Sequence, residues 1–573
     1  MKKNKDFARK YYFAIIIVLA ILVKHIITIN LPLDARDPSG ADEYLMLEQA
    51  EQLVAGNYLG PYNYLTLVKG IAFPLFLAFS NVTGISLLAL YSIFYAAACL
   101  VALVPIRRII KRKPLQLLAF LFLLFCPATL DNNVQLIYRN MLIIPQSVLL
   151  VSALMMMYYH INDEKKNKLV WWTLLASFAW VFMWHTREDS IWSVPLVIGA
   201  WIVMGVMAIK EKKTKIWSKP ILGKIGIITL PFLLLFASIH IISLINYRYY
   251  GVYMTNQLNG SNYTKAVMLM MKVKPAEEIE RVEITRETLQ RLYEVSPTFK
   301  NLEDVIENDY ENKNGLVMAA EDNGEINEDL ITWELTGAAN AKGYYKDAKN
   351  AEKFWGDVYS EIKQAVNEGK LETRATLPSR SLIPFPTKEG SFAKLIWSIG
   401  SLYMRAAKYE NSIMNVEKVD IDEMVARRYE AISGGYAVRE ADAFDGADPM
   451  EVRASRYVRW ASRIKKVYAI ISPVLLIIGI IYYIGLTALI IINAVKKRAC
   501  RYFDRWLFLS ATFGALTVML IGLGYVNAFM VDVNGYIASC NGLLNLFIAL
   551  SMVLIIQDVA NVVLRWRKCR SLQ

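Results

Sequence analysis

Long apolar runs separated by charged loops recur along the whole chain. Each run approaches the roughly 20 residues with which an α-helix crosses a hydrocarbon core about 30 Å thick. The pattern therefore predicts an all-α integral membrane protein with about ten transmembrane helices. The runs lie at residues 11–29, 85–106, 115–130, 141–160, 169–184, 191–209, 224–246, 467–494, 506–529 and 535–558.

A shorter apolar stretch, residues 65–80, contains Lys69 and Pro74. We expect it to lie at the membrane interface or re-enter it, because it is too short and too polar to cross. The first long run follows a basic segment, and no small-residue cleavage site follows that run. We therefore expect a retained anchor and not a signal peptide that is removed.

The segment between the seventh and eighth runs, residues 247–466, has a different composition. It holds 31 Lys and Arg against 35 Asp and Glu. We expect a mainly helical outer domain here, inserted between a transmembrane module at 1–246 and another at 467–573. Residues 347–370 have the periodicity of a capped amphipathic helix, and residues 377–386 indicate an extended loop. The domain's aromatic residues are expected to form its core: Trp333, Tyr344, Tyr345, Phe354 and Trp355.

Composition excludes several classes of protein. Hydrophobic residues make up 55% of the 573 positions, charged residues make up 20%, and the mean hydropathy is +0.31. Soluble chains are less apolar and more charged, so a soluble enzyme, a fibre and a disordered chain are excluded. Phosphate-cradling glycine loops, His-Glu-x-x-His and paired cysteine ligands do not occur, and ATP-driven transport and zinc hydrolysis lose support.

The net charge of +13 reflects topology and does not indicate a nucleic-acid partner. Both termini and alternate loops carry 28 Lys and Arg, whereas the remaining short loops carry only Arg36, Arg139 and Arg187. Positive residues accumulate on the cytoplasmic side. We therefore expect both termini in the cytoplasm and residues 247–466 outside. That outer segment contains none of the five cysteines, which favours a multi-pass protein of a bacterial cytoplasmic membrane over a eukaryotic lumen.

The densest acidic cluster on a short loop follows the first run, within a first outer loop at residues 32–64. Asp42 and Glu43 open an amphipathic stretch, where a carboxylate can both cap a helix and serve a site. The other acids are Asp34, Asp37, Glu48 and Glu51; of these, we expect Asp34, Glu48 and Glu51 to be solvated.

Three cations lie in or beside the short outer loops and could hold a lipid phosphate. Lys69 lies within an apolar stretch, where a charge is costly unless it is paired. Arg139 precedes the fourth run without an adjacent acid. Arg187 precedes the sixth run beside Glu188 and Asp189. Snorkelling or simple ion pairing remains the alternative for both arginines.

These motifs resemble a known family. Asp42-Glu43-Tyr44, then Tyr58-Leu59-Gly60-Pro61-Tyr62, then Lys69-Gly70 resemble the first outer loop of GT-C glycosyltransferases. That family includes protein O-mannosyltransferases and lipid A aminoarabinose transferases. The similarity covers roughly the first 250 residues and, more loosely, the last three runs. The same order of motifs is also similar to that of uncharacterised bacterial membrane proteins.

The resemblance implies transfer of a sugar from a polyprenyl-phosphate donor to a glycan or lipid-linked acceptor on the outer face. It implies a catalytic acid after the first span, which we assign to Asp42 with Glu43 as the neighbouring alternative. Lys69, Arg139 and Arg187 would then bind the donor phosphate. Asp37, Glu188 and Asp189 are possible supporting residues.

Two points stay open at this stage. The second outer loop offers only Asp131 where the better-studied members carry a further acidic motif, so no metal site is assigned although a divalent metal remains possible. The alternatives to a transferase are a glycan polymerase or ligase and a non-catalytic transporter of lipid-linked glycans. Spans that are nearly free of charge weigh against the transporter.

Overall fold

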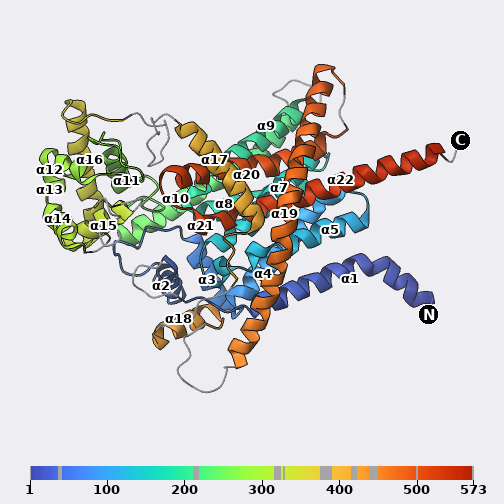
Figure 1. The fold of residues 1–573 in the computed structure, drawn as a ribbon, viewed down its shortest axis with the longest axis horizontal. Helices are drawn as coiled ribbons and strands as arrows, with labels where there is room; N and C mark the ends of the chain where they lie inside the picture. Colours follow the sequence, from blue (N-terminus) through green and yellow to red (C-terminus); the bar gives the residue numbers. More distant parts are fainter. Residues whose placement is uncertain are drawn as a thin grey trace.

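A computed structural model of the protein is helical throughout its regular elements (Figure 1). It describes residues 2–35, 42–210, 219–314, 316, 324–326, 330–374, 390–414, 422–437, 449–498 and 501–570. Asp37 and the expected loop at 377–386 lie outside these residues. In the described part of the chain only two isolated β-bridges occur.

Nine segments of the described chain are long and apolar enough to cross a membrane. This confirms an all-α membrane protein with around ten spans. The helices that carry them are α1 (Lys2–Ile29), α4 (Leu87–Ile109), α7 (Asn140–His160), α8 (Asn167–Thr186), α9 (Val194–Lys210), α10 (Lys219–Tyr250), α19 (Pro449–Val495), α20 (Phe503–Phe529) and α22 (Asn541–Arg570).

The third expected span, at 115–130, is not one straight helix. It consists of α5 (Lys113–Leu124) and a segment from Pro127 to Gln135 that bends away by 55°. Pro127 explains the break, since proline has no N–H to donate and disfavours helical backbone in the residue before it. Cys126 accordingly has ψ 121°. Counted as one span, the bent pair raises the total to ten.

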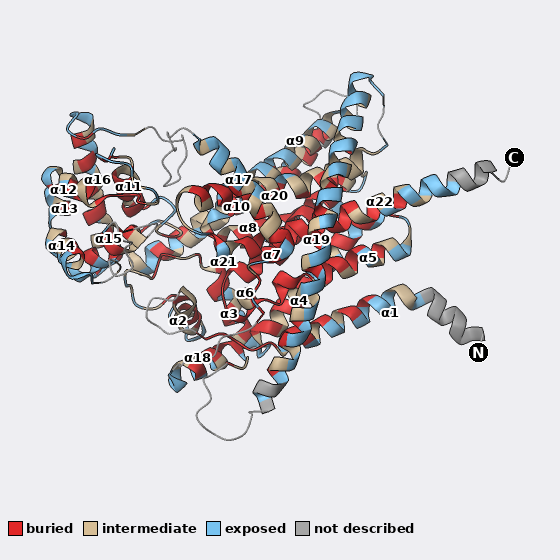
Figure 2. Cartoon of the chain, viewed as in Figure 1, coloured by how far each residue is buried: buried red, intermediate tan, exposed pale blue. Residues whose placement is uncertain are grey.

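Helix α7 lies at the centre of the bundle, and its whole apolar window is buried. Helices α4, α8 and α22 pack around it, and buried positions are concentrated along this axis in Figure 2. The approach of α22 is close, because a Cβ added at Gly542 would meet Ile144 O at 2.7 Å. The site described below lies at the N-terminal end of α7.

The short stretch at 65–80 does not form a spanning helix in the structure. It contains α3 (Ala72–Thr83), which has 12 residues and is too short to span a bilayer. Helix α2 (Asp42–Val54) packs beside it. The two helices link the first span to α4 and carry Lys69 on the irregular segment between them.

The first part of the inserted segment is a helical module with its own hydrophobic core. The expected amphipathic helix is α16 (Ala348–Asn367), which Asp347 caps by accepting a hydrogen bond from Asn350 N at 2.8 Å. Tyr345, Phe354 and Trp355 are buried in this core as expected, with Tyr344 at its edge. The other helices are α11 (Asn262–Met270), α12 (Arg286–Val295), α13 (Pro297–Lys300), α14 (Glu303–Asn312) and α15 (Leu330–Ala341).

The later part of the inserted segment packs against the membrane helices instead. Helix α17 (Ser391–Lys408) lies along α20, and α18 (Glu423–Ser433) lies on α2 and α3. Helix α19 then runs without interruption through the expected boundary at 466. In Figure 1 the module of α11–α16 lies at one end of the molecule and both termini lie at the other.

Candidate functional site

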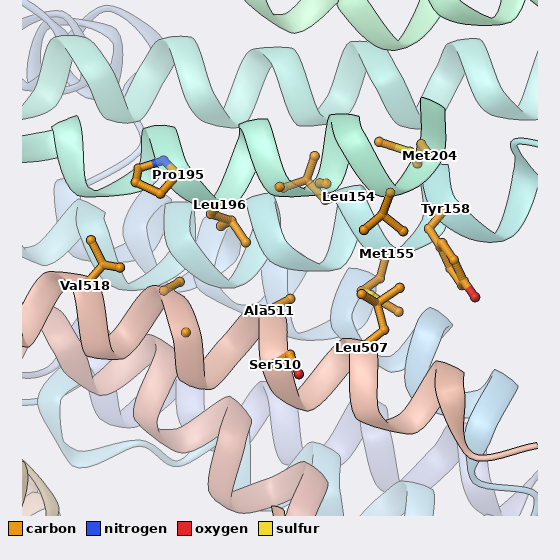
Figure 3. A pocket seen from close by; sticks show the side chains of 15 residues that line it. Leu154, Met155, Tyr158, Pro195, Leu196, Met204, Leu507, Ser510, Ala511 and Val518 are labelled. Carbon is orange, nitrogen blue, oxygen red and sulfur yellow. The ribbon is translucent and has the colours of Figure 1, made fainter. Parts of the chain in front are cut away.

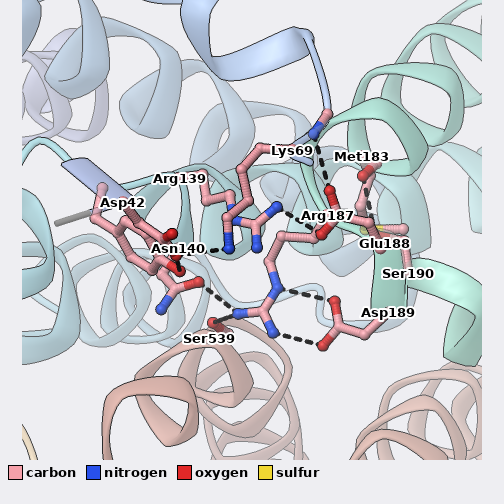
Figure 4. A network of polar contacts seen from close by, with 12 residues as sticks. Asp42, Lys69, Arg139, Asn140, Met183, Arg187, Glu188, Asp189, Ser190 and Ser539 are labelled. Atoms are coloured by element: carbon pink, nitrogen blue, oxygen red, sulfur yellow. Dashed lines mark hydrogen bonds and ion pairs between the residues drawn. The ribbon is translucent and has the colours of Figure 1, made fainter. Parts of the chain in front are cut away.

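Asp42 and Lys69 form the first contact of the site. Helix α2 begins at Asp42, as expected for the Asp-Glu pair. The Asp42 carboxylate lies 2.7 Å from Lys69 Nζ and accepts a hydrogen bond from the Tyr138 hydroxyl at 3.2 Å (Figure 4). Glu43 is half-buried in the same first turn. Asp42 thus contacts the first of the cations, Lys69, directly.

Arg139 pairs with Glu188 across the bundle. Arg139 Nη1 lies 2.6 Å from Glu188 Oε2, and the second oxygen of Glu188 accepts a hydrogen bond from Gly70 N at 2.8 Å. The Glu188 carboxylate, in the turn after α8, thus connects Arg139 at the start of α7 with Gly70, the residue next to Lys69. Arg139 Nε is buried and has no hydrogen-bond partner in the described structure, so this guanidinium has a donor to spare.

Arg187 is held more completely. Its Nε and Nη2 donate to the two oxygens of Asp189 at 2.8 and 2.6 Å, the fork geometry that favours carboxylates. Its Nη1 donates to Asn140 Oδ1 and, at 3.4 Å, to Ser539 Oγ. The guanidinium also lies 4.8 Å from the centroid of the Tyr536 ring. Residues from α7, η2 (Glu188–Ser193) and the start of the last span meet here.

Local structure brings the three cations together. Arg139 is the N-cap residue of α7, and Arg187 lies between α8 and the short helix η2. Lys69 precedes α3 on a segment that Gly70 fixes against the chain at His185. Each is therefore on a short loop at the same end of the bundle. The structure brings Asp42, Lys69, Arg139, Arg187, Glu188 and Asp189 together at this end, and their functional roles stay a prediction.

Burial sets the electrostatics of this cluster. Arg139 and Arg187 are only 5% and 6% exposed. Burial by itself would lower the pKa of each guanidinium, but the adjacent carboxylates of Glu188 and Asp189 outweigh it, and the pKa of both arginines is raised. Both therefore keep a permanent positive charge in a site with little water, where an anion is attracted more strongly than at an open surface.

Three features of the site were not expected from the sequence. Tyr138 contacts Asp42. Trp333, which we had placed in the core of the outer module, instead lies with its ring centroid 5.7 Å from Lys69 Nζ. Glu188 pairs with Arg139 and not with its neighbour Arg187. The sequence motifs Tyr138-Arg139 and Arg187-Glu188-Asp189 indicate loops. No local signal indicates which side chain each of these residues contacts.

The expectation that the remaining acids are solvated is wrong for two of the three. Asp34 is 7% exposed, and its backbone N donates to Gln135 O. Glu51 lies 2.5 Å from Arg428 of α18, with Glu48 at 3.7 Å from the same guanidinium. Helix α18, more than 370 positions away, covers this part of α2, which the local charge pattern could not reveal.

An apolar crevice runs along the membrane helices from the site end of α9. It lies between α7, α9 and α20, has a volume of about 320 Å³, and is lined almost entirely by hydrocarbon (Figure 3). Pro195, at one end of it, follows Arg187 by eight positions along η2 and the first turn of α9. Gly199, Ala200, Ala511 and Gly514 leave the space between the two helices open.

Within the residues that the structure describes, no group of three or more His, Cys, Asp or Glu side chains comes together as a metal site would require. Asp131 is buried and caps the short helix α6 (Asn132–Gln135) by accepting a hydrogen bond from Asn133 N. It therefore has a structural task in the loop that precedes α7.

No family model and no curated protein sequence matches this chain. Among solved structures, it is similar to ArnT from Cupriavidus metallidurans, in the apo state and bound to undecaprenyl phosphate. Both alignments have 11% identity and cover 93% of this chain and 78% of the other, with TM-scores of 0.32 and 0.29. Sequence identities and TM-scores this low say nothing about the chemistry of this protein. The functional conclusion therefore rests on the residues of the site.

Proposed function

We propose that this protein is a membrane glycosyltransferase of the GT-C type, which transfers a sugar from a polyprenyl-phosphate donor to an acceptor on the outer face of a bacterial cytoplasmic membrane. The observation that carries the proposal is the convergence of Asp42 with Lys69, Arg139 and Arg187 at one end of the helical bundle. The acceptor would be a glycan or a lipid-linked glycan.

The cations suit a phosphate. Arginine guanidinium groups bind phosphate oxygens through parallel N–H donors, and lysine adds a point charge. In the structure each cation has one carboxylate partner: Asp42 for Lys69, Glu188 for Arg139 and Asp189 for Arg187. A phosphate entering the site would compete with these carboxylates, and the unused Nε donor of Arg139 could bind it in addition.

Competition between the donor phosphate and Asp42 for Lys69 would free the Asp42 carboxylate to act as the base. When Lys69 turns to the donor phosphate, the Asp42 carboxylate loses its ion pair and becomes available to a hydroxyl. Asp42 then accepts the proton of the acceptor O–H while the acceptor oxygen bonds to the sugar's anomeric carbon. The bond between that carbon and the phosphate oxygen breaks. Its electrons stay on the polyprenyl phosphate, whose charge Arg139 and Arg187 stabilise.

The crevice suits the hydrocarbon chain of such a donor. A lipid carrier must place its phosphate at the cations while its chain stays among apolar side chains. Pro195, which lines the crevice, follows Arg187 by only eight positions in the chain. A water-soluble nucleotide sugar would have no use for the crevice.

Lipids that copurify with the protein test the proposal. The protein in mild detergent should carry a polyprenyl-phosphate species that mass spectrometry identifies. Arg139→Gln should reduce binding of added undecaprenyl phosphate by about ten-fold or more, because a charge-assisted hydrogen bond contributes about 1.5–3 kcal/mol. Arg286→Gln is the matched control, since Arg286 forms an ion pair of equal length, 2.6 Å, with Glu307 in the outer module.

Two results would contradict the proposal. The first is equal binding of undecaprenyl phosphate by wild type, Arg139→Gln and Arg286→Gln. The second is lipid binding without sugar transfer to any acceptor when polyprenyl-phosphate sugars are supplied in proteoliposomes, which would favour a transporter of lipid-linked glycans.

A further inference from the structure

Helix α17 carries a large apolar face that the described part of the protein leaves uncovered. Trp397 is 81% exposed, Phe392 is 76% exposed and Ile396 is 54% exposed. Phe392 and Ile396, four positions apart, lie on one face of the helix, and Trp397 lies about 100° further round it. A patch of this kind on a soluble surface marks an interaction site, because water contact with large apolar side chains is unfavourable.

Residues further along α17 lie against the membrane-spanning helix α20. Ser398 Oγ accepts a hydrogen bond from Asn527 Nδ2 at 3.0 Å, and Tyr403 and Thr517 share another at 2.6 Å. Contact at Gly524 is close: a Cβ there would meet Ile399 at 2.6 Å. Helix α17 is therefore fixed in position relative to a span, and it does not belong to the core of the α11–α16 module.

These contacts set the level of the exposed residues. Asn527 lies near the end of α20, which ends at Phe529. Lys394 Nζ lies 5.5 Å from the centroid of the Phe529 ring. Phe392 and Ile396 flank Lys394, and Trp397 directly precedes Ser398. The three exposed side chains therefore lie at the level where α20 leaves the hydrocarbon core. Tryptophan is favoured at that depth, because its amphipathic ring meets both lipid and water.

We propose that α17 is a membrane-interface helix, and that Phe392, Ile396 and Trp397 insert into the headgroup region of the bilayer beside the end of α20. The occupant of this face is lipid and not another protein surface. Helix α17 has three basic residues and no acidic residue, a composition typical of helices that lie in the interface. Each basic residue is already paired within the protein: Lys394 with Glu280, Arg405 with Asp532 and Lys408 with Glu410.

The consequence concerns the α11–α16 module. Through the Lys394–Glu280 pair at 2.5 Å, α17 connects the interface to the loop before α12. The interface helix would thereby fix the height of the module, and with it Trp333, above the membrane. This role is independent of the reaction proposed above.

A fluorescent probe at the exposed face tests the proposal. The chain with Cys500→Ser and Cys569→Ser receives Trp397→Cys, is labelled with an environment-sensitive dye and is reconstituted into phosphatidylcholine nanodiscs. Quenching is compared between lipids with a nitroxide near the headgroup and lipids with a nitroxide deep in the acyl chain. We expect blue-shifted emission and a larger loss of fluorescence with the shallow nitroxide than with the deep one.

Two matched positions calibrate the result. Ile470 is 73% exposed on the span of α19, and Ile470→Cys should respond to lipid nitroxides. Asp357, exposed on α16 of the outer module, should respond only to a water-soluble quencher when it is changed to cysteine. Ile396→Cys repeats the measurement if Trp397→Cys does not fold. Quenching of the 397 and 396 probes by iodide alone would overturn the proposal, and protection from both iodide and lipid nitroxides would assign the face to a protein partner instead.

Discussion

Glu188 binds Arg139 across 49 positions of sequence, at 2.6 Å, although Arg187 is its immediate neighbour. With its other oxygen it accepts the Gly70 amide. A single carboxylate therefore connects the loops that carry Lys69, Arg139 and Arg187. The Glu188 carboxylate therefore lies among the cations that we propose to bind the donor phosphate.

Glu188→Gln should destabilise the empty protein and strengthen its response to phosphate. Removing one member of a buried ion pair costs about 3–5 kcal/mol, because the remaining charge is left without compensation. A bound phosphate would supply that compensation. We expect a lower apparent melting temperature without ligand and a larger increase on addition of undecaprenyl phosphate than in the wild type. An identical increase in both proteins would mean that Glu188 and the lipid do not compete.

Asp42→Asn should abolish most of the transfer reaction while it leaves lipid binding intact. The amide keeps the shape of the side chain but cannot accept the acceptor's proton, and loss of a general base costs about 10²-fold or more in turnover. Lys69, released from its pair at 2.7 Å, remains free for the phosphate. Steady-state transfer and lipid binding are measured on the same preparation.

Glu43→Gln is the control for the Asp42 prediction, since it removes the neighbouring carboxylate of the same helical turn. It should retain most of the activity. If Glu43→Gln is inactive and Asp42→Asn is active, the base is Glu43. If both variants are active, neither residue is the base and the assignment of a catalytic acid to α2 fails.

Gly70→Ala should damage the site through a backbone contact. A Cβ at residue 70 would lie 2.3 Å from His185 O, a separation that only movement of one chain segment can relieve. That movement would break the Gly70–Glu188 hydrogen bond and displace Lys69. Undecaprenyl phosphate binding should fall. The control is Gly226→Ala in α10, where nothing lies within 4 Å of an added Cβ; equal losses in both variants would contradict this account.

The topology predicted from charge can be tested by labelling in intact cells. In a background with Cys500→Ser and Cys569→Ser, Asp357→Cys should react with a membrane-impermeant maleimide. Lys165→Cys, in the exposed basic loop between α7 and α8, should react only after the membrane is opened. Both termini are then cytoplasmic, in agreement with the accumulation of positive residues. The reverse pattern would invert the whole arrangement.

The helical membrane architecture can be predicted from the amino-acid pattern alone. Hydropathy located the spans, because a helix in lipid must satisfy its backbone hydrogen bonds internally and present apolar side chains along its whole length. Local signals located the start of α2 at Asp42 and of α16 after Asp347, since caps act over three residues. Candidate cations could be selected for the same reason: charges beside apolar runs are rare and easily recognised.

The way in which these residues combine depends on the complete fold. The partner of Arg139, the position of Trp333 over Lys69 and the cover of α18 over Glu51 depend on contacts between segments far apart in the chain. Likewise, the charged composition of residues 247–466 indicated a separate domain, yet α17 packs along α20. Hydropathy and capping report on a residue and its near neighbours, whereas ion pairing and helix packing depend on which surfaces the complete fold brings together.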